Sequence, residues 1–252
     1  MIEFLKRHPF PVRSVYRRAY LGLNPLLFPT IHVNEFPKSG GTWLCRMLRD
    51  CLDWRLDDNA YPLPGKAVVK HHRIRFPHLP TVTVVRDPRD VAVSYYHHCR
   101  RVFAADGFNR NIVALMRERV FDGCSTPEEE LAAFVEMMVE KPISPAFTWG
   151  DFYRSGHRRE TVLVRYEDMR SDPAATLTRI FENVGQTVDA QKIAAVVDSH
   201  DISKILQQRT DTSAAHFVRK GEVGGWRRDL TPKSVALIER DAGALLDSFG
   251  YA

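Results

Sequence analysis

A nine-residue segment at Phe36–Leu44 (FPKSGGTWL) constrains the fold of this chain more than any other feature. Apolar residues at Ile31 and Val33 lead into it and predict a strand, whereas Met47 and Leu48 continue the apolar pattern of a helix beyond it. The segment therefore predicts a strand, a tight loop and a helix N-terminus in immediate succession. In an open α/β fold, such a loop lies at the carboxyl edge of the sheet, where ligands bind.

The chemistry of this loop favours an anion. Gly40 and Gly41 allow backbone N–H groups to turn inward, and the helix dipole adds partial positive charge at the same place. Lys38 and Thr42 contribute a charge and a hydroxyl. The loop differs from the nucleotide triphosphatase pattern G-x-x-x-x-G-K-[ST], because its lysine precedes the glycines and Trp43 follows them. Taken alone, it predicts a phosphate site but is also compatible with an ordinary turn.

Strand and helix patterns alternate along the chain. The strand-like runs are Ile31–Phe36, Ala67–Lys70, Thr81–Arg86 and Thr161–Arg165. The helical patterns are Thr42–Leu52, Pro88–Phe103, Pro127–Glu140, Ala174–Val184, Asp189–Leu206 and Thr231–Leu246. Alternation of this kind implies a parallel sheet. We therefore expect one α/β domain over residues 31–252, with a central parallel β-sheet flanked by helices and preceded by a basic arm at residues 1–30.

The composition narrows the class of protein. With 252 residues, 44% of them hydrophobic, the chain is long enough to bury one sizeable core. None of its apolar runs approaches the roughly 18 residues of a membrane span, so stable membrane insertion is not expected. The net charge of +5 suits an enzyme for anionic ligands or a nucleic-acid-binding protein, and it does not separate the two.

Two features bear on the cellular setting. The four cysteines, at positions 45, 51, 99 and 124, lack C-x-x-C spacing and follow no secretory leader, so we expect reduced thiols in a cytoplasm, with neither a metal nor a structural disulfide. The first 30 residues mix basic and apolar side chains and include Pro9, Pro11 and Pro25. This arm is interpreted either as a loosely packed extension or as a segment that touches a membrane surface transiently.

A second phosphate-binding pattern occurs at Thr81–His98. A buried β-branched strand delivers Arg86 at its carboxyl end, Asp87 is placed to cap the next helix, and a proline suits its first turn. Ser94 lies two helical turns beyond Asp87 and returns to the same face of the helix. Arg86 and Ser94 are thus predicted to bind a phosphate together. The alternative is an Arg86–Asp90 pair with Ser94 facing solvent.

Two weaker patterns carry further cations. The run Arg219-Lys220-Gly221 lies in a polar segment, residues 207–222, that we interpret as a mobile loop able to close over an anion, although a basic surface turn would look the same. The run Lys70-His71-His72 ends a predicted strand with a cation and two imidazoles. Histidine is the usual general base, although a pair of this kind can also be structural or exposed.

Together these four segments, in this order, resemble the sulfotransferase family that uses 3′-phosphoadenosine 5′-phosphosulfate (PAPS), especially its cytosolic branch, and the chain looks like a bacterial-type member. The resemblance extends from about Val33 to Thr231 and includes the run Arg165-Tyr166-Glu167-Asp168-Met169. It implies the P-loop-like sulfotransferase fold. It also implies a PAPS-dependent sulfotransferase that releases 3′-phosphoadenosine 5′-phosphate (PAP) and needs no metal.

The resemblance further implies a role for each matching residue. The 5′-phosphosulfate would be cradled by the loop residues Lys38, Ser39, Gly40, Gly41, Thr42 and Trp43, the last of which packs on the adenine. The 3′-phosphate would be bound by Arg86, Ser94, Arg219, Lys220 and Gly221, while Tyr166 would contact the adenine. His72 matches the catalytic base of a Lys-Thr-His motif, with Lys70 at the lysine position and His71 in place of the threonine.

The residue types then define the expected chemistry. His72 accepts the proton of a hydroxyl acceptor whose oxygen attacks sulfur in line with the departing phosphate oxygen. Lys38 stabilises that leaving phosphate, and Lys70 stabilises the sulfuryl oxygens. Two departures from the family concern the binding of the cofactor. Gly41 stands where threonine is frequent, and the run His200–Ser203 lacks a stacking phenylalanine, which leaves the second face of the adenine unassigned.

Two other classes of function stay open at this stage. A nucleotide kinase shares a strand–loop–helix phosphate site, although the Gly-Lys-Ser/Thr ending and a metal-binding aspartate at the end of a nearby apolar strand are missing. A nucleic-acid-binding protein fits the basic charge, although the aromatics of Tyr95–Arg101 fall on a predicted helix rather than on a stacking platform. The favoured interpretation involves no nucleic acid.

The acceptor is predicted only by class. A small alcohol or phenol, a glycan or a hydroxyl of a peptide natural product is compatible with the chain, and its pocket is sought in the segments 103–126 and 142–153. The aromatic residues there are either pocket walls or core: Phe108, Phe147, Trp149 and Phe152. The oligomeric state stays open, because Leu230-Thr231-Pro232 lacks the Thr-Val of the family's dimerisation motif.

Overall fold

A parallel β-sheet forms the centre of the molecule. The computed structural model describes residues 10–57, 63–73, 81–104, 114–156, 161–207 and 221–252. Within those residues the sheet has five strands in the order β2-β3-β1-β4-β5, every neighbouring pair being parallel. The strands are β1 (Thr30–Glu35), β2 (Arg55–Asp57), β3 (Ala67–His71), β4 (Thr81–Val85) and β5 (Thr161–Arg165). The predicted α/β fold with a central parallel sheet is confirmed.

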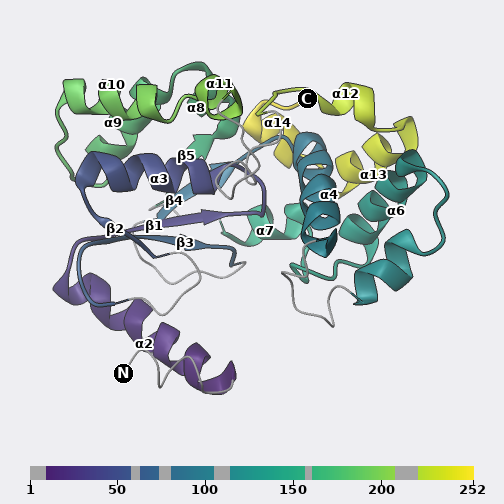
Figure 1. Ribbon diagram of the computed structural model, residues 1–252, viewed down its shortest axis with the longest axis horizontal. Coiled ribbons are helices and arrows are strands. Elements are labelled where there is room, and N and C mark those ends of the chain that lie inside the picture. Colours follow the sequence, from purple (N-terminus) through teal and green to yellow (C-terminus); the bar gives the residue numbers. More distant parts are fainter. Residues whose placement is uncertain (1–9, 58–62, 74–80, 105–113, 157–160, 208–220) are drawn as a thin grey trace.

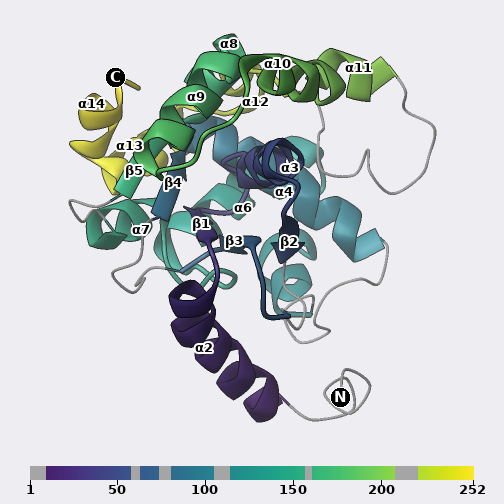
Figure 2. The ribbon, with the colours of Figure 1, turned by 90° about the vertical axis from the view of Figure 1, so that its left-hand side faces the viewer.

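Helices surround this sheet (Figures 1 and 2). Before β5 they are α2 (Phe10–Leu27), α3 (Gly41–Leu52), α4 (Pro88–Ala104), the π-helical turn η1 (Arg117–Phe121), α6 (Pro127–Glu140) and α7 (Trp149–Gly156). After β5 they are α8 (Tyr166–Ser171), α9 (Pro173–Asn183), α10 (Ala190–Ser199), α11 (Ile202–Gln207), α12 (Trp226–Asp229), α13 (Pro232–Ala242) and α14 (Leu245–Phe249). In the described parts of the chain, no helix has the length and apolar character to cross a membrane.

The helices fall into groups with different positions (Figure 1). Helices α3, α9 and α10 lie on one side of the sheet, and α2 lies on the other. Helices α4, α6, α13 and α14 gather beyond the carboxyl ends of the strands and form a second hydrophobic cluster there. The edge at which the strands end therefore faces another packed group of helices.

Helix α3 shows how the sequence pattern produces this packing. Leu44, Met47, Leu48 and Cys51 recur at helical spacing, and all are buried against the sheet. Burial of one such side chain contributes about 1.5–3 kcal/mol to stability. Because these residues form one apolar stripe, the helix packs against the sheet along its length, and its N-terminus lies at the end of β1. Truncation of Leu48 to alanine is expected to cost about 2–5 kcal/mol.

Some elements differ from the prediction. The pattern predicted as one helix over Asp189–Leu206 forms two, because the chain turns at His200 and the Asp201 carboxylate accepts the N–H of Lys204 to start α11. The pattern over Thr231–Leu246 is interrupted at Gly243, whose φ of +54° ends α13. Strand β2 was not predicted, since three residues carry no detectable period.

The predicted N-terminal arm contains α2 and contacts the sheet through its last turns. Tyr20 donates to Asp57 Oδ2 at 2.7 Å, and Asn24 exchanges hydrogen bonds with the backbone of Gly65 at 2.9 and 3.0 Å. Tyr20 and Leu21 are buried with Ala67 and Val69 of β3. The division at residue 30 between an arm and a domain stays a prediction.

Candidate active site at the carboxyl ends of the strands

The loop between β1 and α3 has the conformation that its glycines allow. Lys38 and Gly40 have φ values of +73° and +105°, and the Ser39 N–H bonds to Phe36 O at 3.2 Å. A Cβ atom on Gly40 would lie 2.5 Å from Cδ2 of Tyr166, so only glycine fits there. The predicted tight loop and helix N-terminus are therefore present. They lie at the carboxyl end of the central strand.

Ser39 belongs to the interior of this loop. Its side chain is fully buried, and its hydroxyl lies 3.3 Å from the hydroxyl of Tyr153, which donates to Val84 O at 2.6 Å. Tyr153 lies on α7, and Val84 lies on β4. The serine hydroxyl thus ties the loop to the neighbouring strand through a tyrosine.

Lys38 carries a partly buried ammonium group beside other cations. Burial lowers the pKa of Lys38 to about 8. The carboxylate of Glu35 opposes this shift, whereas the positive charges of Arg101, Lys70 and Arg86 add to it. An ammonium that is desolvated and surrounded by like charge interacts strongly with an arriving anion.

Lys70 approaches the same loop from β3. Its Nζ donates to Thr42 Oγ1 at 2.7 Å and lies 3.8 Å from Glu35 Oε1, and the residue is only 8% exposed. Lys70 stands opposite Val33 in the sheet register, so β1 and β3 deliver the loop and the second lysine to one edge. The structure therefore brings Lys38, Lys70 and Thr42 together at this edge.

The two adjacent histidines have different surroundings. His72 Nδ1 lies 2.9 Å from the backbone oxygen of Glu35, which favours the tautomer protonated at Nδ1 and leaves a lone pair on Nε2. The buried His71 points to the opposite face of the sheet, because side chains alternate along a strand, and its Nε2 lies 3.1 Å from His32 Nδ1. Burial lowers the pKa of His32 to about 4. His71 is thus held on the His32 side of the sheet, whereas His72 contacts the last residue of β1.

Arg86 follows β4 and reaches across the loop. Its guanidinium donates to Glu222 O at 2.8 Å and to Lys38 O at 3.4 Å, and it stacks on the ring of Tyr166 at 4.3 Å. Among the described contacts Asp90 accepts two backbone N–H groups rather than a guanidinium N–H, although the Arg86 charge acts on its carboxylate. Ser94 is half-buried on α4, two turns beyond Asp87.

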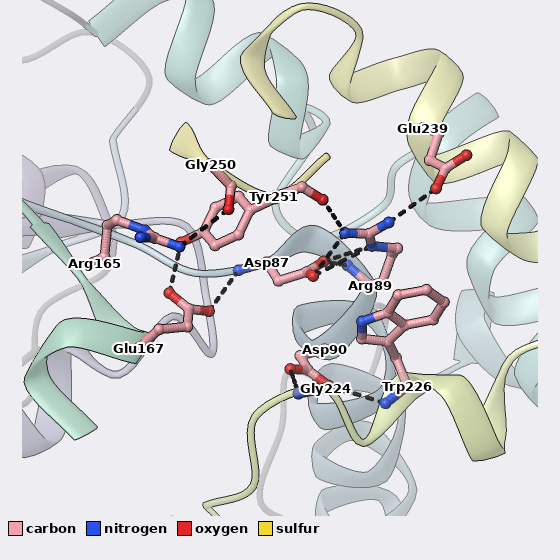
Figure 3. Close-up of polar contacts among 10 residues, drawn as sticks. All are labelled: Asp87, Arg89, Asp90, Arg165, Glu167, Gly224, Trp226, Glu239, Gly250 and Tyr251. Carbon is pink, nitrogen blue, oxygen red and sulfur yellow. Dashed lines mark hydrogen bonds and ion pairs between the residues drawn. The ribbon is translucent and has the colours of Figure 1, made fainter. Parts of the chain in front are cut away.

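The start of α4 anchors the segment that contains Gly224 and Trp226 (Figure 3). Asp87 accepts the N–H of Arg89 at 2.9 Å and so caps α4 as predicted. Asp90 accepts the N–H groups of Gly224 at 2.7 Å and Trp226 at 3.0 Å. The sequence pattern did not reveal this role for Asp90, because its partners lie more than 130 residues away.

The C-terminus joins the same network (Figure 3). Arg89 donates to Tyr251 O and pairs with Glu239 at 2.9 Å. The Tyr251 hydroxyl donates to Glu167 Oε2 at 2.7 Å, and the other Glu167 oxygen accepts the N–H of Asp87 at 3.1 Å. The end of β4, the start of α8 and the end of the chain are thereby held together next to Arg86.

Aromatic and apolar groups lie beside the loop on the side of α8 and α11. Trp43 and Tyr166 pack edge to face with ring centroids 6.3 Å apart, and Trp43 Nε1 donates to His200 O at 3.0 Å. The Tyr166 hydroxyl donates to Gly221 O at 3.2 Å. Gly221 has a φ of +62°, and a Cβ there would lie 2.7 Å from Ile202 Cγ2. Ile202 was not predicted as a site residue; it carries no polar signal.

The other predicted site residues are two cations of the late segment and four aromatic residues of the predicted acceptor pocket. Arg219, Lys220 and Phe108 lie outside the described residues. Phe147, in the predicted segment 142–153, packs against the hydrophobic core beside Phe36 and Tyr95, and the gap that these residues line is too narrow for a water molecule. Trp149 and Phe152 are each 2% exposed and belong to the hydrophobic core, so the core alternative is the one observed for them.

Comparisons with known proteins identify the family. Residues 64–250 match the family model described as the sulfotransferase domain. Sulfotransferase 1C2 of Rattus norvegicus is 23% identical over 69% of this chain and 58% of its own length. Sulfotransferase 1C2 of Homo sapiens is 22% identical over 59% of this chain and 48% of its own length. The chain thus spans about half the length of these two relatives. Cytosolic sulfotransferase 16 of Arabidopsis thaliana is 24% identical over 82% of the chain and 73% of its own length.

Solved structures share the fold. Mouse sulfotransferase SULT7A1, complexed with PAP, superposes with a TM-score of 0.65 at 20% identity and covers 92% of both chains. Retinol dehydratase, in complex with androsterone and PAP, gives a TM-score of 0.56 at 15% identity, covering 92% of this chain and 85% of its own. The predicted P-loop-like sulfotransferase fold is confirmed by these likenesses. Since the family model matches most of its length, this chain belongs to the sulfotransferase domain family.

Proposed function

We propose that the protein transfers the sulfuryl group of PAPS to a hydroxyl acceptor and releases PAP. The observation that carries this proposal is the meeting of Lys38, Lys70 and Arg86 around one loop and one helix N-terminus, with His72 at the same edge. Cations and inward N–H groups bind phosphate, and an imidazole beside them supplies a base. A kinase would need a metal-bound nucleotide, for which the loop has no Gly-Lys-Ser/Thr ending.

In the proposed reaction, His72 Nε2 takes the proton of the acceptor hydroxyl as its oxygen forms a bond to sulfur. The bond between sulfur and the bridging phosphate oxygen breaks in line, and the electron pair leaves with PAP. Lys38 and the loop N–H groups stabilise the charge on that leaving oxygen, and Lys70 stabilises the sulfuryl oxygens. The bond from His72 Nδ1 to Glu35 O supports this role, because in the neutral imidazole it places the proton on Nδ1 and the lone pair on Nε2.

The nucleotide end of PAPS is assigned to the other half of the site. Arg86 and Ser94 would bind the 3′-phosphate, joined by Arg219, Lys220 and Gly221 from the late segment. Trp43 and Tyr166 would contact the adenine, and their edge-to-face packing and burial support a preformed aromatic wall. The presence of PAP in structures of the same fold supports this assignment.

The acceptor is proposed as a small molecule or glycan with a free hydroxyl. Androsterone and retinol accompany PAP in structures of retinol dehydratase, which supports an apolar hydroxyl compound as one class.

A labelled-donor assay tests the proposal. The protein is incubated with ³⁵S-labelled PAPS and a panel of phenols and alcohols, in parallel with γ-³²P-ATP and Mg²⁺. We expect ³⁵S transfer and PAP release, reduced about 10²- to 10⁴-fold in His72→Asn, the range typical of a lost general base. His71→Asn, on the opposite face of the sheet, is the matched control once circular dichroism shows that it folds. Transfer of ³²P in place of ³⁵S would contradict the proposal.

A further inference from the structure

Glu35 is a buried carboxylate in contact with the phosphate-binding loop. It is the last residue of β1, its side chain is 3% exposed, and its Oε2 accepts the N–H of Gly41, the first residue of α3, at 2.5 Å. A carboxylate at a helix N-terminus is stabilised by the helix dipole. Here, however, it occupies a loop whose proposed ligand is itself an anion, so its presence requires an explanation.

The contact with Gly41 depends on the absence of a side chain there. A Cβ on Gly41 would lie 2.6 Å from Glu35 Cδ and 2.8 and 2.9 Å from its two carboxylate oxygens. Real Cβ contacts are not that short, so a residue larger than glycine would push the carboxylate away. Glu35 and Gly41 are therefore coupled: the glycine leaves the space that the carboxylate fills.

The same carboxylate faces the lysines of the site. Glu35 Oε1 is 3.8 Å from Lys70 Nζ, which also donates to Thr42 Oγ1 at 2.7 Å, so one ammonium contacts both the carboxylate and the loop. Both members of this pair are more than nine-tenths buried. Removal of one partner of a buried ion pair strongly destabilises the folded protein, because the charge of the other partner is left uncompensated.

The charge of Glu35 also acts on Lys38. The charges that act on Lys38 include the negative Glu35 on β1 and the positive Lys70 on β3, Arg86 after β4 and Arg101 on α4. Burial lowers the pKa of His98 on α4, and Lys38, Arg101 and Lys70 add to that shift. Burial raises the pKa of Tyr153 on α7, and Glu35 adds to that shift. Glu35 thus raises the pKa of Lys38 against burial and three cations, and it favours the charged lysine near neutral pH.

We propose that Glu35 is a positioning residue of the phosphate-binding loop, which holds the N-terminus of α3 and the Lys70 ammonium in the geometry that receives the 5′-phosphosulfate. It does not touch the reacting atoms; it acts through Gly41, Lys70 and Lys38. The inference rests on the proposed function, because it concerns the same site. It goes beyond that function by assigning a role to a residue that no sequence pattern indicated.

Calorimetric titration with PAP tests this role in Glu35→Gln, which keeps an oxygen for the Gly41 N–H but removes the charge. At pH 7 we expect PAP affinity to fall at least about fivefold, because Lys70 loses its ion-pair partner. In the wild type, PAP affinity should decline as the pH rises through about 8, where Lys38 loses its proton. In Glu35→Gln this decline should begin at a lower pH, a shift that a merely structural role would not cause.

A double-mutant cycle with Gly41→Ala keeps the inference falsifiable if one variant folds poorly. Gly41→Ala alone should weaken PAP binding. The double variant Glu35→Ala/Gly41→Ala should bind PAP more tightly than the sum of the losses in Glu35→Ala and Gly41→Ala predicts, because the new methyl group at position 41 then has room where the Glu35 carboxylate stood. Wild-type affinity and pH profile in Glu35→Gln, or tighter binding of PAP, would overturn the inference and make the carboxylate a competitor of the phosphate. Failure of the wild type to bind PAP would overturn the proposed function as well.

Discussion

Replacement of Lys38 by methionine is expected to stabilise the fold while it lowers the rate of sulfuryl transfer. Burial and neighbouring cations lower the pKa of Lys38 from 10.5 to about 8. One pKa unit corresponds to about 1.36 kcal/mol, so the charged lysine destabilises the folded state by up to about 3 kcal/mol. Lys38 is only partly buried, and this value is therefore an upper limit. Methionine has a similar length and carries no charge, so it removes the penalty.

The pH dependence follows from the sign of this shift. Because the pKa is lower in the folded chain than in the unfolded chain, the penalty is present in full below pH 8. It disappears as the pH rises from about 8 to 10.5, since the lysine is then neutral in both states. The advantage of Lys38→Met over the wild type should therefore be largest near pH 7 and vanish above pH 10.5.

Urea unfolding at several pH values measures this difference. At pH 7 we expect the free energy of unfolding to rise by about 1–3 kcal/mol, and Tm to rise by roughly 2–4 °C per kcal/mol. Lys66→Met, at an exposed position, is the matched control and should change stability by less than about 0.5 kcal/mol. Sulfuryl transfer should fall about 10²- to 10³-fold. Equal or lower stability of Lys38→Met at pH 7 would refute the reasoning.

Three further changes test other contacts. Gly40→Ala should lower the free energy of unfolding by about 2 kcal/mol or more, because the φ of Gly40 is +105° and the new Cβ would lie 2.5 Å from the Tyr166 ring. An unchanged free energy of unfolding in urea would count against this loop geometry. Asp90→Ala should weaken PAP binding about tenfold in calorimetry, since the hydrogen bonds from Gly224 and Trp226 to Asp90 are lost. Wild-type affinity in this variant would argue against a role for Asp90 in anchoring that segment. Tyr251→Phe should cost about 1–3 kcal/mol in urea unfolding by leaving Glu167 without its 2.7 Å donor; a neutral effect would show that this bond contributes little.

Local signals were sufficient for much of the fold. The helix predicted at Pro127–Glu140 has those bounds because Thr126 and Glu129 form a capping box and a proline occupies its first turn. The β1 loop was predictable because glycine, lysine and helix start lie within nine residues. Strand β2 was missed because three half-buried residues have no period, and it pairs with β3 only through tertiary contact.

The candidate site was predictable in part for the same reason. Lys38, Lys70, His72 and Arg86 each belong to a local motif and meet because parallel strands end at one edge. Glu35 and Asp90 were missed, because their roles depend on space beside a glycine and on N–H groups from a distant segment. The different surroundings of His71 and His72 follow from the alternation of side chains along a strand. This argument applies only once β3 is known to extend through His71.

Calorimetric titration with PAP in the absence of metal tests the central claim most directly, with ATP and Mg²⁺ alongside and Arg86→Ala as the control. The account predicts micromolar PAP binding that Arg86→Ala weakens roughly 10- to 100-fold, as expected for the loss of a charge-assisted hydrogen bond, and much poorer binding of ATP. No binding of PAP by the wild type, or tighter binding of ATP with Mg²⁺, would contradict it.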